Sequence, residues 1–278
     1  MTDSAPHDSA PDETAPPGTP HPFDAAIRLA ALGEGRFAGR TTEAYRNMVG
    51  PYGGITAAVM LQALLQRPER LGDPVALTVN YAGPVRDGEF EIATREIRTS
   101  RSTQHWFAEM RQGVQGEVST TATAVFGTRR DTWHHTEARQ PALPARESIA
   151  ALRSSTHAPW SERYERRTVD DLEAGESRGW LTDVPARPLD FPGLASLCDA
   201  FRPWIFARRR QRTPIGTVTL NVYFHAAADE LAAIGATPLQ GVARTNTIHR
   251  GFFDQEAQVW TPDGRLLATT QQVVWFKE

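Results

Sequence analysis

The residue of this 278-residue chain that is best placed for acid–base chemistry is Asp199. It follows Leu194 and Leu197 and precedes Phe201, in a segment whose apolar residues have the spacing of a helix. A carboxylate in such surroundings is costly unless it is hydrogen-bonded, and it could take a proton from a bound water. Taken alone, an aspartate on a helix is more often exposed or caps a turn, so Asp199 needs support from other residues.

Two glycines could bind a developing negative charge. Gly53 and Gly54 open an apolar segment, residues 55–65, that is predicted to be a helix buried on most sides. Free N–H groups at a helix N-terminus suit an oxyanion, and glycine lets a ligand approach the backbone. The same glycines could instead serve only a tight turn, and the sequence favours both interpretations equally.

Arginine and cysteine residues near Asp199 are weaker candidates. Arg208 and Arg210 could bind phosphate groups, although a run of charges is more often a solvated loop. Cys198 is adjacent to Asp199, but neighbouring helix residues point about 100° apart. We therefore predict a buried thiol at Cys198 rather than a nucleophile that shares a site with Asp199.

The elements that must position these residues occur twice along the chain. Each copy consists of a strand, an apolar helix and four further strands bounded by turn signals. In the first copy the helix is predicted at residues 55–65, and the strands at 40–45, 75–82, 89–100, 103–111 and 117–126. In the second copy the helix is predicted at 189–206, and the strands at 179–184, 217–225, 239–248, 251–261 and 265–276.

The two copies align with each other. Leu77-Thr-Val-Asn-Tyr81 corresponds to Leu220-Asn-Val-Tyr-Phe224, and Val125-Phe126 corresponds to Trp275-Phe276. A unit with one apolar helix buries it by wrapping its sheet around it, and two such sheets can join edge to edge. The sequence therefore predicts an α+β double hotdog, in which two β-α-β-β-β-β repeats form one continuous antiparallel sheet wrapped around two central helices.

Composition sets the expected domain boundaries. Residues 1–21 contain no aromatic and no β-branched aliphatic residue, so they are predicted to be a disordered tail. Residues 22–128 are predicted to form the N-terminal hotdog, 129–177 a linker and 178–278 the C-terminal hotdog. The paired histidines His134 and His135 are assigned to the solvated linker rather than to a metal site.

Charge and cysteine content narrow the classes of function. A net charge of −3 argues against a nucleic-acid or anionic-membrane partner, since either usually calls for a basic face. One cysteine allows neither an intramolecular disulfide nor a cysteine-rich metal site. Because the sequence has no secretory signal and no apolar run long enough to cross a bilayer, we expect a soluble, cytoplasmic protein without metal or cofactor.

Six segments carry a resemblance to a known family, and the resemblance extends over nearly all of residues 37–276 apart from the linker. Three look like the N-terminal half of thioesterase-like double-hotdog proteins: Gly50-Pro-Tyr-Gly-Gly54, Leu77-Thr-Val-Asn-Tyr81 and Pro84-Val-Arg-Asp-Gly88. Three are similar to the acyl-CoA thioesterase II family: Ser196-Leu-Cys-Asp199, Thr217-Val-Thr-Leu-Asn-Val-Tyr-Phe-His225 and Asp263-Gly-Arg-Leu-Leu-Ala-Thr-Thr-Gln-Gln272.

The resemblance implies that the chain hydrolyses acyl-CoA thioesters to free fatty acid and coenzyme A, as part of fatty acid metabolism. Asp199, Thr217 and Gln272 match the catalytic positions of the family. Thioester hydrolysis needs an activated water, a group that orients it and donors for the carbonyl oxygen. Asp199 would therefore accept the proton of the water that Thr217 and Gln272 hold, and no covalent nucleophile is required.

The other expected contacts follow from the same substrate. Gly53 and Gly54 would bind the oxyanion or the substrate, and Arg208 and Arg210 would meet the phosphates of coenzyme A. Acyl-CoA is the expected partner, and exposed sheet edges favour a homodimer or homotetramer.

Two departures from the family pattern affect these assignments. The strand at Leu77-Thr-Val-Asn-Tyr81 lacks the histidine of the best-known members. Gln271 precedes Gln272, and neighbouring residues of a strand point to opposite faces of the sheet. The alignment favours Gln272 as the residue that faces the site and leaves Gln271 as the alternative.

Two other functions are compatible with the predicted fold. A hotdog hydratase or dehydratase acting on enoyl- or hydroxyacyl-CoA would carry Asp and His a few residues apart at a helix start, and neither predicted helix has an Asp-x4-His pair. A non-catalytic acyl-CoA binding protein would have no need of the three polar residues. Both alternatives are therefore less favoured than thioester hydrolysis.

Overall fold

The computed structural model of the chain describes residues 20–209, 211 and 213–278. The predicted disordered tail lies outside these residues except for Pro20 and His21. The prediction is wrong for His21, which caps the first helix, α1 (Pro22–Ala26), by accepting a hydrogen bond from the Phe23 backbone N–H at 3.1 Å. Its Nε2 lies 2.9 Å from the Pro185 carbonyl oxygen, so His21 belongs to the folded N-terminal unit and not to the tail.

Within the described residues, thirteen strands form one sheet, and all neighbouring strands are antiparallel. The first half contributes β1 (Ala30–Gly33), β2 (Arg36–Arg40), β3 (Asp73–Tyr81), β4 (Glu89–Thr99), β5 (Thr103–Gln112) and β6 (Glu117–Gly127). The second half contributes β7 (Tyr164–Asp171), β8 (Glu176–Asp183), β9 (Ile215–Phe224), β10 (Leu239–Arg244), β11 (Ile248–His249), β12 (Phe252–Trp260) and β13 (Leu266–Phe276).

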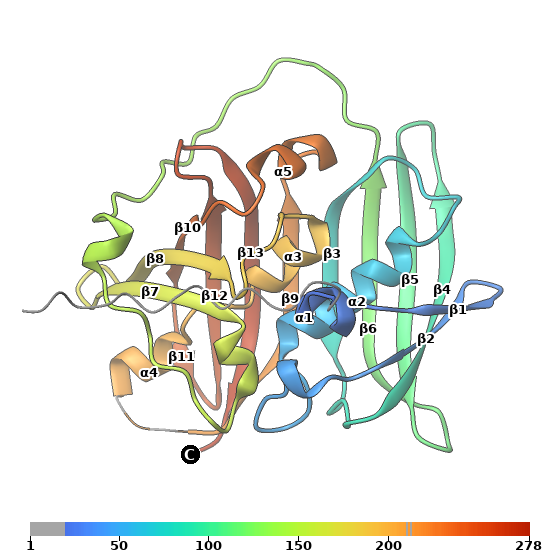
Figure 1. Ribbon diagram of the computed structural model, residues 1–278, viewed down its shortest axis with the longest axis horizontal. Coiled ribbons are helices and arrows are strands. Elements are labelled where there is room, and N and C mark those ends of the chain that lie inside the picture. The colour runs from blue at the N-terminus through green and yellow to red at the C-terminus, as the bar shows by residue number, and fades with distance from the viewer. Residues whose placement is uncertain (1–19, 210, 212) are drawn as a thin grey trace, which may run out of the picture.

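The strand order confirms the predicted double hotdog. It runs β1-β2-β4-β5-β6-β3-β9-β13-β12-β10-β8-β7, with β11 paired to β12 off this path. The second half of the order is the first half reversed, and β3 and β9 meet at the centre (Figure 1). Each repeat also has a strand beyond the predicted unit, β1 or β7, at the outer edge of the sheet.

The seam between the repeats lies on a pseudo-twofold axis. Thr78 and Asn221 occupy equivalent positions in the alignment of the two copies, and they are paired directly across β3 and β9. The Thr78 hydroxyl donates to the Asn221 side-chain oxygen at 2.8 Å. Because Thr78 and Asn221 are equivalent residues paired across β3 and β9, the pseudo-twofold axis passes between them. A side chain that lies next to β3 and β9 is therefore close to both repeats.

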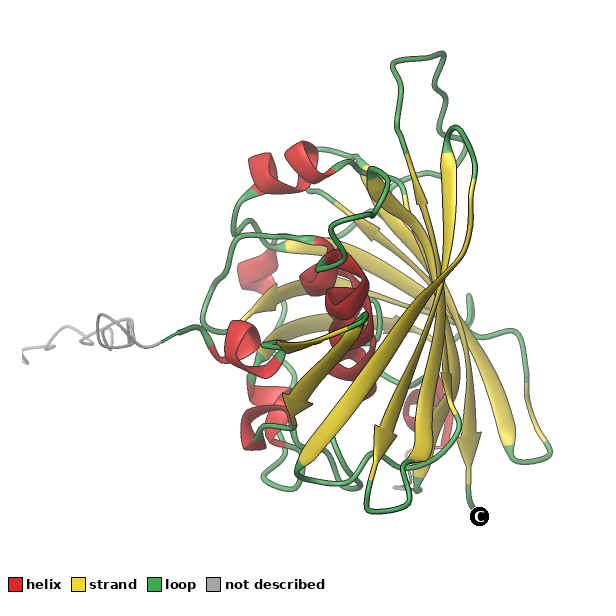
Figure 2. Ribbon diagram, turned by 90° about the vertical axis from the view of Figure 1, so that its right-hand side faces the viewer, coloured by secondary structure: helices red, strands yellow, loops and turns green. Residues whose placement is uncertain are grey.

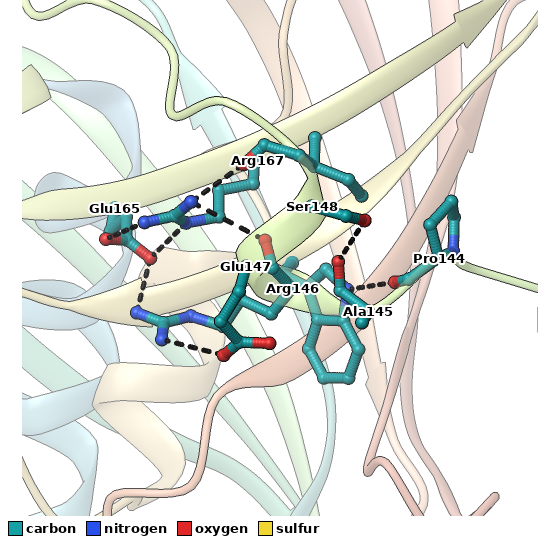
Figure 3. Close-up of polar contacts among 9 residues, drawn as sticks. Pro144, Ala145, Arg146, Glu147, Ser148, Glu165 and Arg167 are labelled. Carbon is teal, nitrogen blue, oxygen red and sulfur yellow. Dashed lines mark hydrogen bonds and ion pairs between the residues drawn. The ribbon is translucent and has the colours of Figure 1, made fainter.

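The segment predicted as a linker is shorter than expected, because it contains β7 and the start of β8. The sequence of β7 is largely charged and lacks a clear apolar alternation, as is common for an edge strand. Figure 3 shows how the preceding chain covers this edge: Arg146 and Arg167 both pair with Glu165. Arg167 also donates to the Ile149 carbonyl oxygen at 2.7 Å.

The helix predicted at residues 189–206 is two helices. They are α3 (Phe191–Leu197) and α4 (Trp204–Arg209), separated by a bend that contains Pro203. Proline has no N–H to donate to the preceding turn, and it disfavours helical conformation in the residue before it. Asp199 consequently lies just beyond the α3 C-cap Cys198, where its N–H donates to the Ser196 carbonyl oxygen at 3.1 Å. A fifth helix, α5 (Ala228–Ile234), was not predicted.

The two central helices, α2 (Gly53–Leu65) and α3, pack against each other on the concave side of the sheet (Figures 1 and 2). Their close approach depends on Gly54, where a Cβ atom would lie 2.6 Å from the Ser196 carbonyl oxygen and 2.5 Å from the Tyr52 ring. No helix in the described part of the chain is long and apolar enough to cross a membrane.

We expect Gly54→Ala to lower the free energy of unfolding by about 1–3 kcal/mol, because backbone atoms of α3 would have to move. Urea denaturation measures this change. Gly83→Ala is the control, since a Cβ there meets nothing within 4 Å. Equal losses in the two variants would contradict the close contact between α2 and α3.

Candidate active site

Asp199 points its carboxylate at the N-terminus of α2. A Cβ atom on Gly53 would lie 2.8 Å from Asp199 Oδ2, so only glycine leaves room for the carboxylate at this position. The backbone N–H of Gly54 faces the same carboxylate as a hydrogen-bond donor. A helix N-terminus favours negative charge, which makes this a suitable place for an ionised aspartate.

The two central helices differ in how their N-termini are capped. In α3 the N-cap residue Asp190 accepts a hydrogen bond from the Gly193 backbone N–H at 2.8 Å. In α2 the N-cap residue is Tyr52, whose side chain makes no capping bond within the described chain. The first turn of α2 is therefore open to a group from elsewhere, and Asp199 of the second repeat occupies this place.

Thr217 holds Gln272, and Gln272 lies beside the Asp199 carboxyl group. The Thr217 hydroxyl donates to Gln272 Oε1 at 3.4 Å. The Gln272 side chain faces the Asp199 carboxyl group and lowers its pKa. Because the amide oxygen of Gln272 faces Thr217, its NH₂ group is the one available to a carboxylate. The structure thus brings together the three residues that the sequence singled out.

A β-bulge turns Thr217 toward the concave side of the sheet. Thr219 pairs with Val273, but Thr217 pairs with the next residue, Val274, so Val218 is an extra residue in β9. Val273 is exposed on the outer face and Val274 is buried on the inner face. Without the bulge, Thr217 and Thr219 would share the outer face, since side chains two apart in a strand point the same way.

The choice between Gln271 and Gln272 is settled by the register of β13. Gln272 is only 5 % exposed and lies between the buried Thr270 and Val274 on the inner face. Gln271 is exposed on the outer face, beside the open groove that Tyr223 and Arg244 line. Gln272 is therefore the amide that reaches Asp199, as the alignment favoured.

The environment of Asp199 makes its carboxyl group a weak acid. Although the residue is partly exposed, burial of the carboxyl group raises its pKa from 3.8 to about 7, while the hydrogen bonds from Gly54 and Gln272 lower it. Burial and the nearby Asp199 charge also raise the pKa of the Tyr52 and Tyr81 hydroxyl groups. A carboxylate poised near neutral pH has the protonation behaviour of a general base.

The equivalent positions of the other repeat are apolar. The alignment pairs Gln272 with Ala122. Counted from the first residue of each helix, the position of Asp199 corresponds to Leu61 in α2, next to Met60. All three are fully buried in the core. Among the described residues, the polar cluster of Asp199, Thr217 and Gln272 is therefore present on one side of the pseudo-twofold axis. On the other side, apolar core residues occupy the equivalent positions.

The remaining predicted residues lie around this cluster. Cys198 is fully buried, and burial raises the pKa of its thiol, which keeps it protonated. Arg208 is exposed, with its guanidinium 5.5 Å from the centre of the Trp204 ring. The backbone N–H of Trp204 donates to the side-chain oxygen of Gln255, the strand partner of Gln272, so α4 is anchored beside Gln272. Arg210 lies outside the described residues.

Two tyrosines of the cluster were not predicted. The Tyr52 hydroxyl donates to the Ser196 carbonyl oxygen at 2.9 Å, and its ring stacks on Trp160 at 4.1 Å. The Tyr81 hydroxyl donates to the Gly53 carbonyl oxygen at 2.8 Å. Both tyrosines stand in segments that carry the family resemblance, but a tyrosine beside a glycine-rich turn or at a strand end is too common to indicate a site.

Comparison with known proteins agrees with this arrangement. The C-terminal domain of acyl-CoA thioesterases matches residues 134–276, and the N-terminal domain matches residues 42–127. Among curated proteins, none matches the chain in sequence.

Solved structures share the fold over nearly the whole chain. A hot-dog-fold protein of unknown function from Alicyclobacillus acidocaldarius is 44% identical, with a TM-score of 0.89 over 94% of this chain and 99% of that chain. An acyl-CoA thioesterase II from Mycobacterium marinum is 15% identical, with a TM-score of 0.74 over 92% of this chain and 98% of that chain. The resemblance seen in the sequence is confirmed, and the chain belongs to the acyl-CoA thioesterase family.

Proposed function

We propose that the chain hydrolyses acyl-CoA thioesters and that Asp199 is its general base. The observation that supports this most is the carboxyl group itself: it is enclosed, burial raises its pKa to about 7, and it faces Gln272, which Thr217 holds in turn. A carboxylate that served only to cap α2 would gain nothing from a raised pKa, because the ionised form is the one that caps well.

The proposed reaction uses one water molecule. Asp199 accepts a proton from the water, and the oxygen of this water attacks the thioester carbonyl carbon. The carbonyl oxygen becomes an oxyanion. The carbon–sulfur bond then breaks, and the proton on Asp199 passes to the departing sulfur. The products are a carboxylic acid and coenzyme A, and the carboxylate of Asp199 is restored for the next cycle.

The other residues have supporting roles in this proposal. Gln272, held by Thr217, keeps Asp199 and the water in line, and the dipole of α2 favours the charge that grows on the carbonyl oxygen. The missing side chain of Gly53 leaves space for the reacting group beside the carboxylate, while the Gly54 N–H holds Asp199. Arg208 lies on a helix anchored beside Gln272 and is the candidate contact for coenzyme A phosphates, with Arg210 as the second candidate from sequence.

Replacing the base should lower turnover strongly without unfolding the protein. We expect Asp199→Asn to lower kcat by about 10²–10⁴, because the amide cannot accept the proton of the water. Release of free thiol from acyl-CoAs of increasing chain length measures this. The matched control is Asp183→Asn, since Asp183 is a second buried carboxyl group whose pKa burial raises to about 7. If Asp199→Asn bound acyl-CoA and the wild type hydrolysed none, the chain would be a binding protein instead.

The pH dependence of kcat/KM should report the ionisation of Asp199. Only the ionised carboxylate accepts a proton, so the rate should rise with pH and level off above an apparent pKa of about 7. Initial rates between pH 5 and 9 measure the profile. A profile that is flat from pH 5.5 to pH 8 would exclude a base with this pKa.

Neighbouring residues on opposite faces provide internal controls for the supporting roles. We expect Thr217→Val to lower kcat about three- to tenfold, the effect of one neutral hydrogen bond, and Gln272→Ala to lower it further. Thr219→Val and Gln271→Ala change the outer face and should leave kcat within twofold. Equal effects of Thr217→Val and Thr219→Val would contradict the bulge in β9. Equal effects of Gln272→Ala and Gln271→Ala would contradict the register of β13.

A further inference from the structure

The hydroxyl of Tyr81 is the polar group that holds the first turn of α2 from the sheet side. Tyr81 ends β3 at the seam between the repeats, and its hydroxyl donates to the Gly53 carbonyl oxygen at 2.8 Å. A Cβ atom on Gly53 would lie 3.5 Å from that hydroxyl and 2.8 Å from Asp199 Oδ2. Tyr81 and Asp199 therefore approach the same residue of α2 from two sides.

The second repeat shows what stands in this place when no carboxylate is present. Phe224 is the residue equivalent to Tyr81, and Phe191, like Gly53, is the first residue of its helix. The two phenylalanine rings pack edge to face, with their centres 5.4 Å apart. Tyr81 and Gly53 thus replace an aromatic contact by a hydrogen bond and an open space, and Asp199 occupies part of that space.

The groups that face the Asp199 carboxyl group come from every element packed around it. The Gly54 N–H belongs to α2, the Gln272 amide to β13, the Tyr52 hydroxyl to the turn before α2 and the Tyr81 hydroxyl to β3. Cys198 precedes Asp199 and is buried. The Gly54 N–H and the Gln272 amide face the carboxylate and lower its pKa, whereas the Tyr81 hydroxyl donates to the carbonyl oxygen of Gly53, one residue before Gly54.

We propose that Tyr81 is a positioning residue: by holding the Gly53 carbonyl oxygen, its hydroxyl keeps the Gly54 N–H directed at the Asp199 carboxylate. The inference rests on the proposed function, in which Asp199 is the base. Tyr81 acts through α2 and does not itself take part in proton transfer.

The test is Tyr81→Phe, which introduces the residue that the equivalent position already carries. We expect kcat to fall about three- to tenfold with KM within twofold, since one neutral hydrogen bond is lost and substrate binding is untouched. In the profile of kcat/KM against pH, the apparent pKa should move up by about half to one pH unit, because the ionised carboxylate of Asp199 loses part of its stabilisation.

The control is Tyr45→Phe, which removes a hydroxyl from another buried tyrosine that lies near Asp183 rather than Asp199. It should leave kcat and the pH profile unchanged. A raised KM with unchanged kcat in Tyr81→Phe would overturn the proposal, because it would make Tyr81 a substrate contact. An unchanged pH profile in Tyr81→Phe would overturn it as well.

A second measurement does not depend on activity. Since burial holds the pKa of folded Asp199 above its unfolded value, the protein should lose stability as pH rises from about 4 to about 7, and this loss should end there. In Tyr81→Phe the loss should extend to higher pH by about half to one unit. In the Asp199→Asn background, Tyr81→Phe should leave the pH dependence unchanged, although Asp183 titrates in the same range in all variants.

The two measurements separate the possible failures. A shifted stability profile in a protein that hydrolyses no thioester would keep Tyr81 as the residue that positions Asp199 and would reject the proposed function. If the chain hydrolyses thioesters but Tyr81→Phe has the same pH profile of stability as the wild type, the function would be kept and the role of Tyr81 rejected.

Discussion

The contact between the Asp199 carboxylate and the open N-terminus of α2 is the interaction on which the rest of the site depends. Burial disfavours the charge, and the Gly54 N–H together with Gln272 only partly offsets that cost, so the carboxyl group titrates near pH 7. If α2 carried its own cap, as α3 does with Asp190, the donor at its N-terminus would be taken. If Gly53 had a side chain, the carboxylate would have no room.

This contact explains why the site needs both repeats. α2 and Tyr81 come from the first repeat, whereas Asp199, Thr217 and Gln272 come from the second. They meet because β3 and β9 join the two sheets on the pseudo-twofold axis, which places the two helices side by side. Neither half could form the site alone, because each would present either a helix N-terminus without its carboxylate or the carboxylate without its donor.

The sequence predicted the parts of this structure that follow from apolar periodicity, and it failed where a single residue changes the local geometry. The repeat, most strand positions and the two central helices were visible in alternation and turn signals. The strand predicted at residues 40–45 was wrong, because β2 ends at Arg40 and residues Glu43–Tyr45 form a 3₁₀ helix. The charged edge strand β7 was not, because its solvent-facing residues lack that alternation. Pro203 divided a helix that was predicted to be continuous, and His21 ordered the end of a tail that composition assigned to disorder.

Thr217 shows the limit of such reasoning within the site. Alternation places it with Thr219 on the outer face, and the inserted residue Val218 turns it inward. A bulge leaves no signature in a sequence of ordinary strand residues, so only the family resemblance pointed to Thr217. Asp199, too, is an unremarkable aspartate until its distance from Gly53 is known, because the cost of its burial depends on a helix nearly 150 residues away in the chain.

The asymmetry of the two repeats follows from the same cost. A second carboxylate at the turn that carries Met60 and Leu61 would require another enclosed charge, with a raised pKa and a matching penalty at neutral and higher pH. In the structure these positions, together with Ala122 and Phe224, are fully buried apolar residues that contribute to the core. This apolar packing in the first repeat stabilises the fold, which has to tolerate the buried carboxyl group of Asp199 in the second repeat. The repeat that supplies α2 can therefore keep its helix N-terminus open, because the rest of that helix is held by apolar contacts on nearly every side.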